Sequence, residues 1–263
     1  MIDSHCHLDF DVFDDDLTHV IERAGEQGVS RFLVPGTTPN GWQKQLQVAE
    51  RFEHVDIAFG LHPYFPDFLT NSNVDKLQVM LDTHRESVCA VGEIGLDKTV
   101  DMPLSQQEDI FSRQLELAQT CELPVILHHR KTHHLLIKHL KACNFSFGGV
   151  IHAFSGSKQI AQEYIDMGFC LGIGGTITYE RAHKTREAVK TLPLSAMLLE
   201  TDSPDMPLCG YQGQRNTPIK IPQVAESLAH LLDTDVETVG HQTDANYRRL
   251  FLSSDSGRDC PSA

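Results

Sequence analysis

The stretch LPVILHHR (123–130) is a short apolar run that ends in two histidines and an arginine. A run of four to six apolar or β-branched residues beside a proline predicts a buried β-strand. Seven other stretches share this pattern, each bounded by glycine, proline or polar residues. The eight predicted strands cover residues 1–5, 31–35, 55–60, 88–93, 124–128, 149–153, 169–173 and 197–201. Strands that are apolar on both faces are typical of parallel sheets covered by helices.

Amphipathic stretches lie between these strands. In 16–28, apolar residues recur at helical spacing from Leu17 to Ala24, and Gly28 stands where a helix would end. Further helices are predicted at 39–52, 74–86, 106–121, 132–142, 158–168 and, after the last strand, within about 218–251. Regular alternation of eight strands with helices predicts an α/β fold, a (β/α)8 TIM-type barrel with additional C-terminal helices. An open doubly wound sheet is the alternative, and no linker divides the chain, so we expect one domain over 1–263.

The composition narrows the class of protein. The chain has 263 residues, of which 40% are hydrophobic and 22% charged. No apolar run is long enough to cross a bilayer, and the acidic start is not typical of a signal peptide, so we expect a cytoplasmic protein without membrane contact. Seven scattered cysteines without a CxxC pair argue against a disulfide framework. A formal charge of −14 disfavours non-specific duplex binding but allows a small phosphorylated or single-stranded substrate. Nothing in the sequence indicates an obligatory protein partner.

Five of the eight predicted strands finish in, or just before, a histidine or an acid. These candidate ligands are His5, His7, Glu93, His128, His152 and Asp202. In a barrel all of these strand ends lie on one rim, where active sites are built. Two histidines at i and i+2 on a strand project to the same face about 7 Å apart, which lets them hold one ion. Imidazole and carboxylate are ligands that suit zinc, manganese and similar divalent ions.

Each of these residues also has an ordinary structural explanation. A lone buried histidine is usually a hydrogen-bonded core residue, and Asp202 could cap a helix. Their coincidence at the ends of five strands favours a metal site. One catalytic zinc usually takes three protein ligands, so six candidates indicate two ions with a carboxylate between them. Paired ions are a recurring device for phosphoester hydrolysis. His62 lies on the same rim, where substrate contact and simple loop structure are both open, and alternation alone does not decide between His128 and His129.

The assembled segments resemble the TatD family of metal-dependent deoxyribonucleases, within the amidohydrolase-like barrels. The matching segments run in order along the chain: DSHCHLD (3–9), GLHPYF (60–65), VGEIGLD (91–97), LPVILHHR (123–130), HAFSG (152–156), LLETDSP (198–204), RNTP (215–218) and NYRRLF (246–251). The resemblance implies a barrel with two metal ions and the same six ligands, and it selects His128 over His129. It also implies that Glu93 bridges the ions, with His5, His7 and Asp202 on one ion and His128 and His152 on the other.

From this resemblance we expect hydrolysis of a phosphodiester, with short or single-stranded DNA ends as the expected substrate. Asp202 is the predicted general base and Glu93 the second catalytic residue, while His62 and Arg130 are predicted to bind substrate. Two divalent ions per chain are expected, with zinc or manganese favoured and magnesium allowed. The alternative function is a binuclear-metal esterase, lactonase or amidohydrolase acting on a small molecule.

The chain departs from the family pattern at three positions. Tyr64 stands where a second histidine is common, Lys131 where an acid often follows the arginine, and Asp205 where an aromatic residue is usual. None of the three is a proposed ligand. All three lie in loops expected to face the substrate, so the resemblance supports the metal site more strongly than it supports DNase activity.

Overall fold

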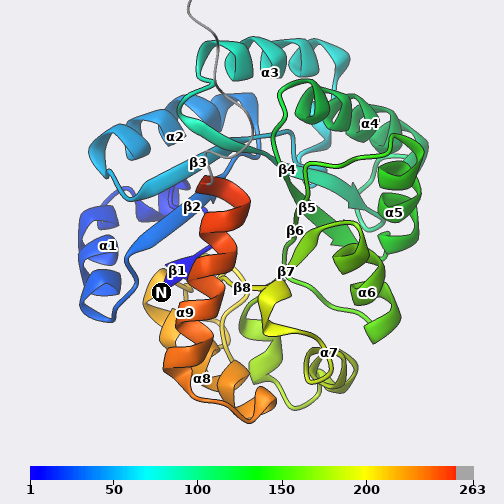
Figure 1. Cartoon of the computed structure of the whole chain (residues 1–263). Helices are drawn as coiled ribbons and strands as arrows, with labels where there is room; N and C mark the ends of the chain where they lie inside the picture. Colours follow the sequence, from blue (N-terminus) through cyan, green and yellow to red (C-terminus); the bar gives the residue numbers. More distant parts are fainter. Residues whose placement is uncertain (253–263) are drawn as a thin grey trace, which may run out of the picture.

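The computed structural model describes residues 1–252. Eight parallel strands form one sheet in chain order: β1 (Ile2–Asp3), β2 (Arg31–Pro35), β3 (Val55–Phe59), β4 (Val88–Asp97), β5 (Val125–Arg130), β6 (Gly149–Ile151), β7 (Phe169–Ile173) and β8 (Met197–Leu199). Figure 1 shows the strands curled around a common axis inside a ring of helices. Each of the eight predicted segments overlaps one of these strands, although β4 and β5 run beyond the predicted ends at 93 and 128. The predicted (β/α)8 barrel is confirmed.

The helices alternate with the strands as expected: α1 (Leu17–Glu26), α2 (Pro39–Arg51), α3 (Asn71–Thr83), α4 (Leu104–Thr120), α5 (His133–Ala142), α6 (Lys158–Asp166), α7 (His183–Val189), α8 (Ile221–Leu232) and α9 (Val236–Tyr247). The apolar stripe predicted for α1 is buried, and Gly28 follows that helix with a φ of 83°. This left-handed conformation is one that glycine adopts without steric cost, which explains why the helix ends there. The sequence analysis missed α7. Within residues 1–252, no helix has the length and apolar character needed to cross a membrane.

Backbone hydrogen bonds close the barrel between its first and last strands. The amide of Ser4 donates to Leu199 O at 2.9 Å, the amide of His7 donates to Ser203 O at 2.7 Å, and the amide of Asp202 donates to His5 O at 2.9 Å. The first bond reaches the last residue of β8, and the other two lie beyond the ends of β1 and β8, which are shorter than the predicted segments. The N-terminal segment is therefore held beside the segment that follows β8.

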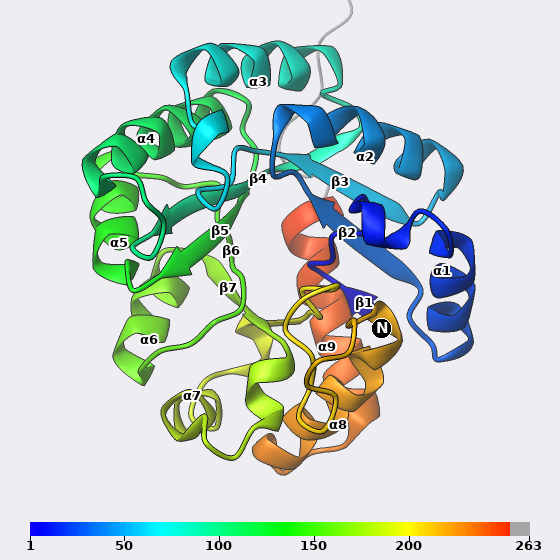
Figure 2. The same ribbon diagram turned by 180° about the vertical axis from the view of Figure 1, so that it is seen from behind.

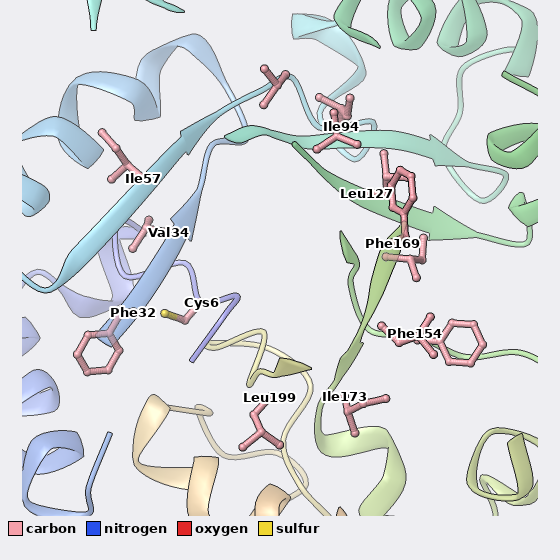
Figure 3. Close-up of a cluster of buried hydrophobic side chains, with 14 of the residues drawn as sticks. Cys6, Phe32, Val34, Ile57, Ile94, Leu127, Phe154, Phe169, Ile173 and Leu199 are labelled. Atoms are coloured by element: carbon pink, nitrogen blue, oxygen red, sulfur yellow. The ribbon is translucent and has the colours of Figure 1, made fainter. Parts of the chain in front are cut away.

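Two hydrophobic clusters fill the molecule. The larger one packs the outer faces of the strands against the helices and includes Cys6, Phe32 and Val34 (Figure 3). The smaller one fills the barrel interior, where Tyr247 and Phe251 pack on inward-facing residues such as Leu33 and Ile126. Figures 1 and 2 show α9 lying across one end of the barrel, which this second cluster closes. The predicted C-terminal helices therefore include one that plugs the barrel, and the opposite end stays available for a site.

The plug is also fixed by polar contacts. The hydroxyl of Tyr247 donates to Asp56 Oδ2 at 2.6 Å, and Arg31 Nη2 donates to Asp56 Oδ1 at 2.7 Å. Burial and the nearby carboxylate raise the pKa of Tyr247 well above its usual value, so its hydroxyl stays protonated and can donate.

Candidate metal centre

The six residues predicted from the strand ends converge around the side chain of Glu93. Its Oε1 atom lies 2.9 Å from His152 Nε2 and 3.1 Å from His128 Nδ1. Its Oε2 atom lies 3.1 Å from His5 Nε2 and 3.6 Å from His7 Nε2. The two oxygens of one carboxylate therefore face two different pairs of imidazoles.

Asp202 lies on the Oε2 side of this cluster. Its Oδ1 atom is 3.4 Å from His5 Nε2 and 3.6 Å from His7 Nε2. The ring of His5 stacks on the ring of His152 with centroids 4.0 Å apart, so the two sides of the cluster are in contact. His5, Glu93 and His152 are buried, while the side chain of Asp202 keeps 15% of its surface exposed.

A bulge in β4 points Glu93 into the barrel. Between the pairs Val91↔Val125 and Ile94↔Leu127, β4 advances three residues while β5 advances two. Side chains alternate along a regular strand, so an acid three residues after the inward-facing Ala90 would normally point outward. The extra residue of a bulge shifts this alternation. Glu93 consequently faces the centre, whereas Ile94 packs in the outer cluster.

His5 and His7 are held on one face by their neighbours on both sides. The amide of Cys6 donates to Leu33 O of β2 at 3.0 Å, and Cys6 forms a parallel bridge with Ser203. Cys6 packs in the outer cluster, opposite to the two histidines, as strand geometry predicts.

The electrostatic surroundings keep both carboxylates charged. Burial would raise the pKa of Glu93, but the neighbouring His152, His62 and His5 hold it well below its usual value. Burial opposes ionisation of Asp202 as well, and its hydrogen bond with His7 together with the nearby imidazoles lowers its pKa. At neutral pH the cluster therefore presents two carboxylates to its imidazoles.

His62 is part of this cluster. Its Nδ1 accepts the backbone N–H of Tyr64 at 2.9 Å, so Nε2 carries the proton and donates to Glu93 Oε1, also at 2.9 Å. Burial lowers the pKa of His62 to about 4, and the ring is neutral at physiological pH.

Asp97 is a participant that the sequence analysis missed. Its Oδ2 lies 3.2 Å from His128 Nε2, and its Oδ1 accepts from the amide and the hydroxyl of Thr99. Burial would raise its pKa, but these hydrogen bonds lower it, so the carboxylate is ionised. An ionised Asp97 favours the His128 tautomer that has its proton on Nε2, which leaves Nδ1 free to act as a ligand.

Glu200 is the second participant that was missed. Its Oε1 accepts the amide of Ala153 at 2.6 Å and lies 3.7 Å from His152 Nδ1. It is almost fully buried on the barrel side of β8, and it occupies space that Gly172 leaves open, since a Cβ at Gly172 would lie 2.0 Å from Glu200 Oε2. Side chains alternate along a strand, so an inward-facing Leu198 implies that Glu200 and Asp202 face inward too. This alternation is the sequence signal that could have identified Glu200.

The donor set fits divalent cations. Within the described residues, both ring nitrogens of His5 and Oε2 of Glu93 are buried and make no hydrogen bond of favourable geometry, although His5 Nε2 lies 3.1 Å from Glu93 Oε2. Leaving such groups unpaired costs roughly 1–3 kcal/mol each, so a bound cation would relieve a penalty that the fold otherwise carries. Three groups of side chains have ligand atoms close enough to share one ion: His5–His7–Glu93, His5–His152–Glu200 and His62–Glu93–His128.

A cavity of about 590 Å³, here called the central cavity, opens over the cluster. His7, Glu93, His128, His152 and Asp202 all line it, together with His62 and Arg130, the two predicted substrate-binding residues. Three positions depart from the family pattern. Tyr64 and Asp205 line the central cavity, whereas Lys131 is exposed and lies outside its wall.

Comparisons with known proteins agree with this fold. The model of the TatD related DNase family matches residues 2–252. An uncharacterized metal-dependent hydrolase from Escherichia coli K12, YjjV, is 41% identical over 251 residues, covering 95% of this chain and 97% of the relative. A 3′-5′ ssDNA/RNA exonuclease from Salmonella typhimurium, TatD, is 30% identical over 258 residues, covering 95% and 98%. The crystal structure of E. coli YjjV superimposes with a TM-score of 0.93 at 40% identity, covering 96% and 98%. The chain therefore belongs to the TatD related DNase family of metal-dependent hydrolases.

Proposed function

We propose that this protein is a phosphodiesterase that uses two divalent metal ions. The observation that carries the proposal is the position of Glu93, whose two oxygens face separate pairs of imidazoles within 2.9–3.6 Å. A carboxylate placed in this way is suited to bridge two ions. His5, His7 and Asp202 would hold the ion on the Oε2 side, and His128 and His152 the ion on the Oε1 side.

The donor chemistry limits which ions fit. Four imidazoles with two carboxylates favour zinc or manganese over magnesium, which prefers oxygen ligands and keeps much of its water. When bound, such ions lower the pKa of water toward neutrality and polarise phosphoryl oxygens. The remaining chemistry falls to the chain's own side chains.

Asp202 is the proposed general base. Its carboxylate is ionised and partly exposed in the central cavity, so a water there can reach it. Glu93 is ionised too, but only 1% of its side chain is exposed, which suits a bridging ligand better than a proton acceptor. Proton transfer to a positioned carboxylate accelerates hydrolysis by about 10²–10⁴-fold.

His62 and Arg130 are proposed to hold the phosphodiester. Both line the central cavity, and Arg130 is exposed at its wall. A guanidinium donates paired hydrogen bonds that match the geometry of phosphoryl oxygens. His62 presents a neutral ring beside Glu93 and supplies an N–H at the cavity wall.

Single-stranded nucleic acid ends are the proposed substrate class. The similarity to the Salmonella TatD exonuclease supports this class. The net charge of −14 opposes tight binding of duplex DNA at long range, whereas a single-stranded end needs to enter only the central cavity.

The test compares two chromogenic substrates after the protein is loaded with zinc or manganese. We expect metal-dependent hydrolysis of bis(4-nitrophenyl) phosphate to exceed hydrolysis of 4-nitrophenyl acetate, and a single-stranded oligonucleotide to shorten from one end. His128→Ala should abolish both phosphodiester activities, while His134→Ala, a change at an exposed histidine of α5, should leave them intact. Hydrolysis of the acetate without any phosphodiester cleavage would instead support the esterase alternative.

A further inference from the structure

A second cavity opens beside the central cavity and shares part of its wall. It has a volume of about 690 Å³, and it is here called the side cavity. Phe10, Thr37 and Phe65 line both cavities, so these residues form the boundary between them. None of the six proposed metal ligands lines the side cavity. A molecule bound at the ions could therefore extend past these residues into separate space.

The wall of the side cavity is suited to an uncharged, flat group. Phe10, Val12, Phe65 and Pro204 contribute apolar surface, and Val12 is 51% exposed. When several large apolar side chains are exposed in one place, the patch they form usually binds something. Of the large hydrophobic residues that are exposed within 1–252, Val12 lines the side cavity, Tyr64 and Met206 line the central cavity, and only Val79 lies apart from both.

The basic side chains of the side cavity are already paired with acids. Lys44 Nζ lies 2.8 Å from Asp11 Oδ1 and 2.6 Å from Asp14 Oδ1. Arg215 makes a two-pronged ion pair with Asp16. Neutralised cations attract a second phosphate only weakly, so the charge distribution favours a neutral ring over an anion.

Two aromatic rings connect the boundary to the proposed metal centre. The ring of Phe10 stacks on that of His7 with centroids 4.6 Å apart and planes at 15°. The ring of Phe65 lies 6.1 Å from that of His62 in an edge-to-face arrangement. A group one sugar away from a phosphate held in the central cavity would reach these two rings.

From these observations we propose that the side cavity binds the nucleobase of the nucleotide whose phosphate is held at the metal centre. This inference rests on the proposed phosphodiesterase function and deepens it, because it assigns the base of the bound nucleotide to one particular cavity. Stacking on aromatic rings is tolerant of base identity and is worth roughly tenfold or more in affinity per base. In this proposal Phe10, Phe65 and Val12 determine specificity because they favour a nucleotide over a phosphate ester that lacks a base.

The first test measures binding. The probes are thymidine 5′-monophosphate and methyl phosphate, which share a phosphomonoester and differ by the nucleoside, and each is titrated calorimetrically into the metal-loaded protein. We expect the nucleotide to bind at least about tenfold more tightly than methyl phosphate. Phe65→Ala removes one ring and Val12→Trp fills the cavity, and each should reduce this advantage to less than about threefold.

A matched control separates the cavity from a general effect of the substitution. Val79 is an equally exposed valine on α3, outside both cavities, and Val79→Trp should keep the full advantage of the nucleotide. Equal affinity for the two probes in the wild-type protein overturns the inference. So does an advantage that survives either Phe65→Ala or Val12→Trp in a folded protein, as judged by circular dichroism.

The second test uses turnover, and it separates the side cavity from the proposed function. Two thymidine esters are compared first, the 5′- and the 3′-(4-nitrophenyl phosphate), and the one that is cleaved faster is kept. Its kcat/KM is then divided by the kcat/KM for methyl 4-nitrophenyl phosphate. We expect this ratio to fall about tenfold in Phe65→Ala and Val12→Trp but not in Val79→Trp. If methyl 4-nitrophenyl phosphate is cleaved while the ratio does not change, the phosphodiesterase stands and the base-binding inference fails. If no diester is cleaved, the proposed function fails, and the binding titration alone decides on the base site.

Discussion

Replacing Gly172 by alanine tests how tightly the barrel packs beneath the metal centre. Gly172 lies in β7, and an added Cβ would come within 2.0 Å of Glu200 Oε2 and 3.0 Å of the Cα of His152. Glu200 could in principle swing away because the clash is with the end of its side chain. It is 1% exposed, however, and its other oxygen accepts the amide of Ala153 at 2.6 Å, so movement breaks that hydrogen bond.

The expected loss of stability follows from these contacts. A hydrogen bond to a charged group contributes about 1.5–3 kcal/mol, and overpacking a filled interior costs a further 1–3 kcal/mol or so. We therefore expect Gly172→Ala to lower the free energy of unfolding by about 2.5–6 kcal/mol. At about 2–4 °C per kcal/mol for a chain of this size, the Tm should fall by roughly 5–25 °C.

Thermal unfolding of the metal-free protein, followed by circular dichroism, measures this loss. The control is Gly25→Ala, because Gly25 lies in α1 and an added Cβ there meets nothing within 4 Å. Alanine is the better helix former, so the control should gain about 0.5–1 kcal/mol. If Gly172→Ala melts with the wild type, the side chain of Glu200 does not occupy the space over β7, and the reasoning is refuted.

Three further predictions concern the centre itself. Asp202→Asn leaves an amide oxygen at the ligand position, so with metal in excess the variant should stay loaded while kcat falls by about 10²–10⁴-fold. Because the pKa of Asp202 is lowered, wild-type activity should fall only at acidic pH, and a pH–rate profile should show that acidic limb flattened in the variant. Asp97→Asn should weaken the metal held by His128 by about 10–100-fold in chelator competition, because the tautomer of His128 is no longer fixed. The pKa of His62 is about 4 in the folded protein, against an ordinary value of 6.5. Between pH 4 and 6.5 the unfolded chain therefore binds more protons than the folded protein, and the free energy of unfolding of the metal-free protein falls as the pH drops through this range. His62→Gln should remove up to about 3 kcal/mol of that fall, measured by urea unfolding across this range.

The strand pattern was readable from sequence because the strands are buried on both faces. Stretches such as 124–128 and 169–173 are almost entirely apolar. One face of each strand packs against the helices and the other faces the barrel interior, so both faces must be apolar. The candidate ligands stood out because a histidine or an acid ends five of the eight runs, always at the same end. Parallel strands in a barrel bring those ends together, so the grouping of these residues followed from the fold class. Only the choice of His128 over His129 came from the family resemblance.

The details that depend on register could not be predicted. Glu93 faces inward because β4 carries a bulge, which only the pairing with β5 reveals. The same pairing sets Asp97 opposite Arg130 and brings its carboxylate to His128. A single sequence shows which residues belong to a strand but not which residues they pair with.

Other omissions have local causes. The helix α7 was missed because its sequence, HKTREAV, is short and mostly polar, and its buried positions include Thr185. The helix α3 begins at Asn71, earlier than expected, because the Thr70 side chain accepts the amide of Asn73 and caps it. Glu200 was overlooked because it sits in the same motif as Asp202, and one carboxylate already satisfied the expected ligand count.

The count of bound ions tests the central claim, the bridging position of Glu93, most directly. Protein saturated with zinc or manganese and freed of excess metal should contain two ions per chain by mass spectrometry. His7→Ala and His128→Ala should each retain one, because each removes a ligand from a different side of Glu93, and Glu93→Ala should retain fewer than one. A wild-type protein with a single ion, or a Glu93→Ala protein that still holds two, would contradict the account.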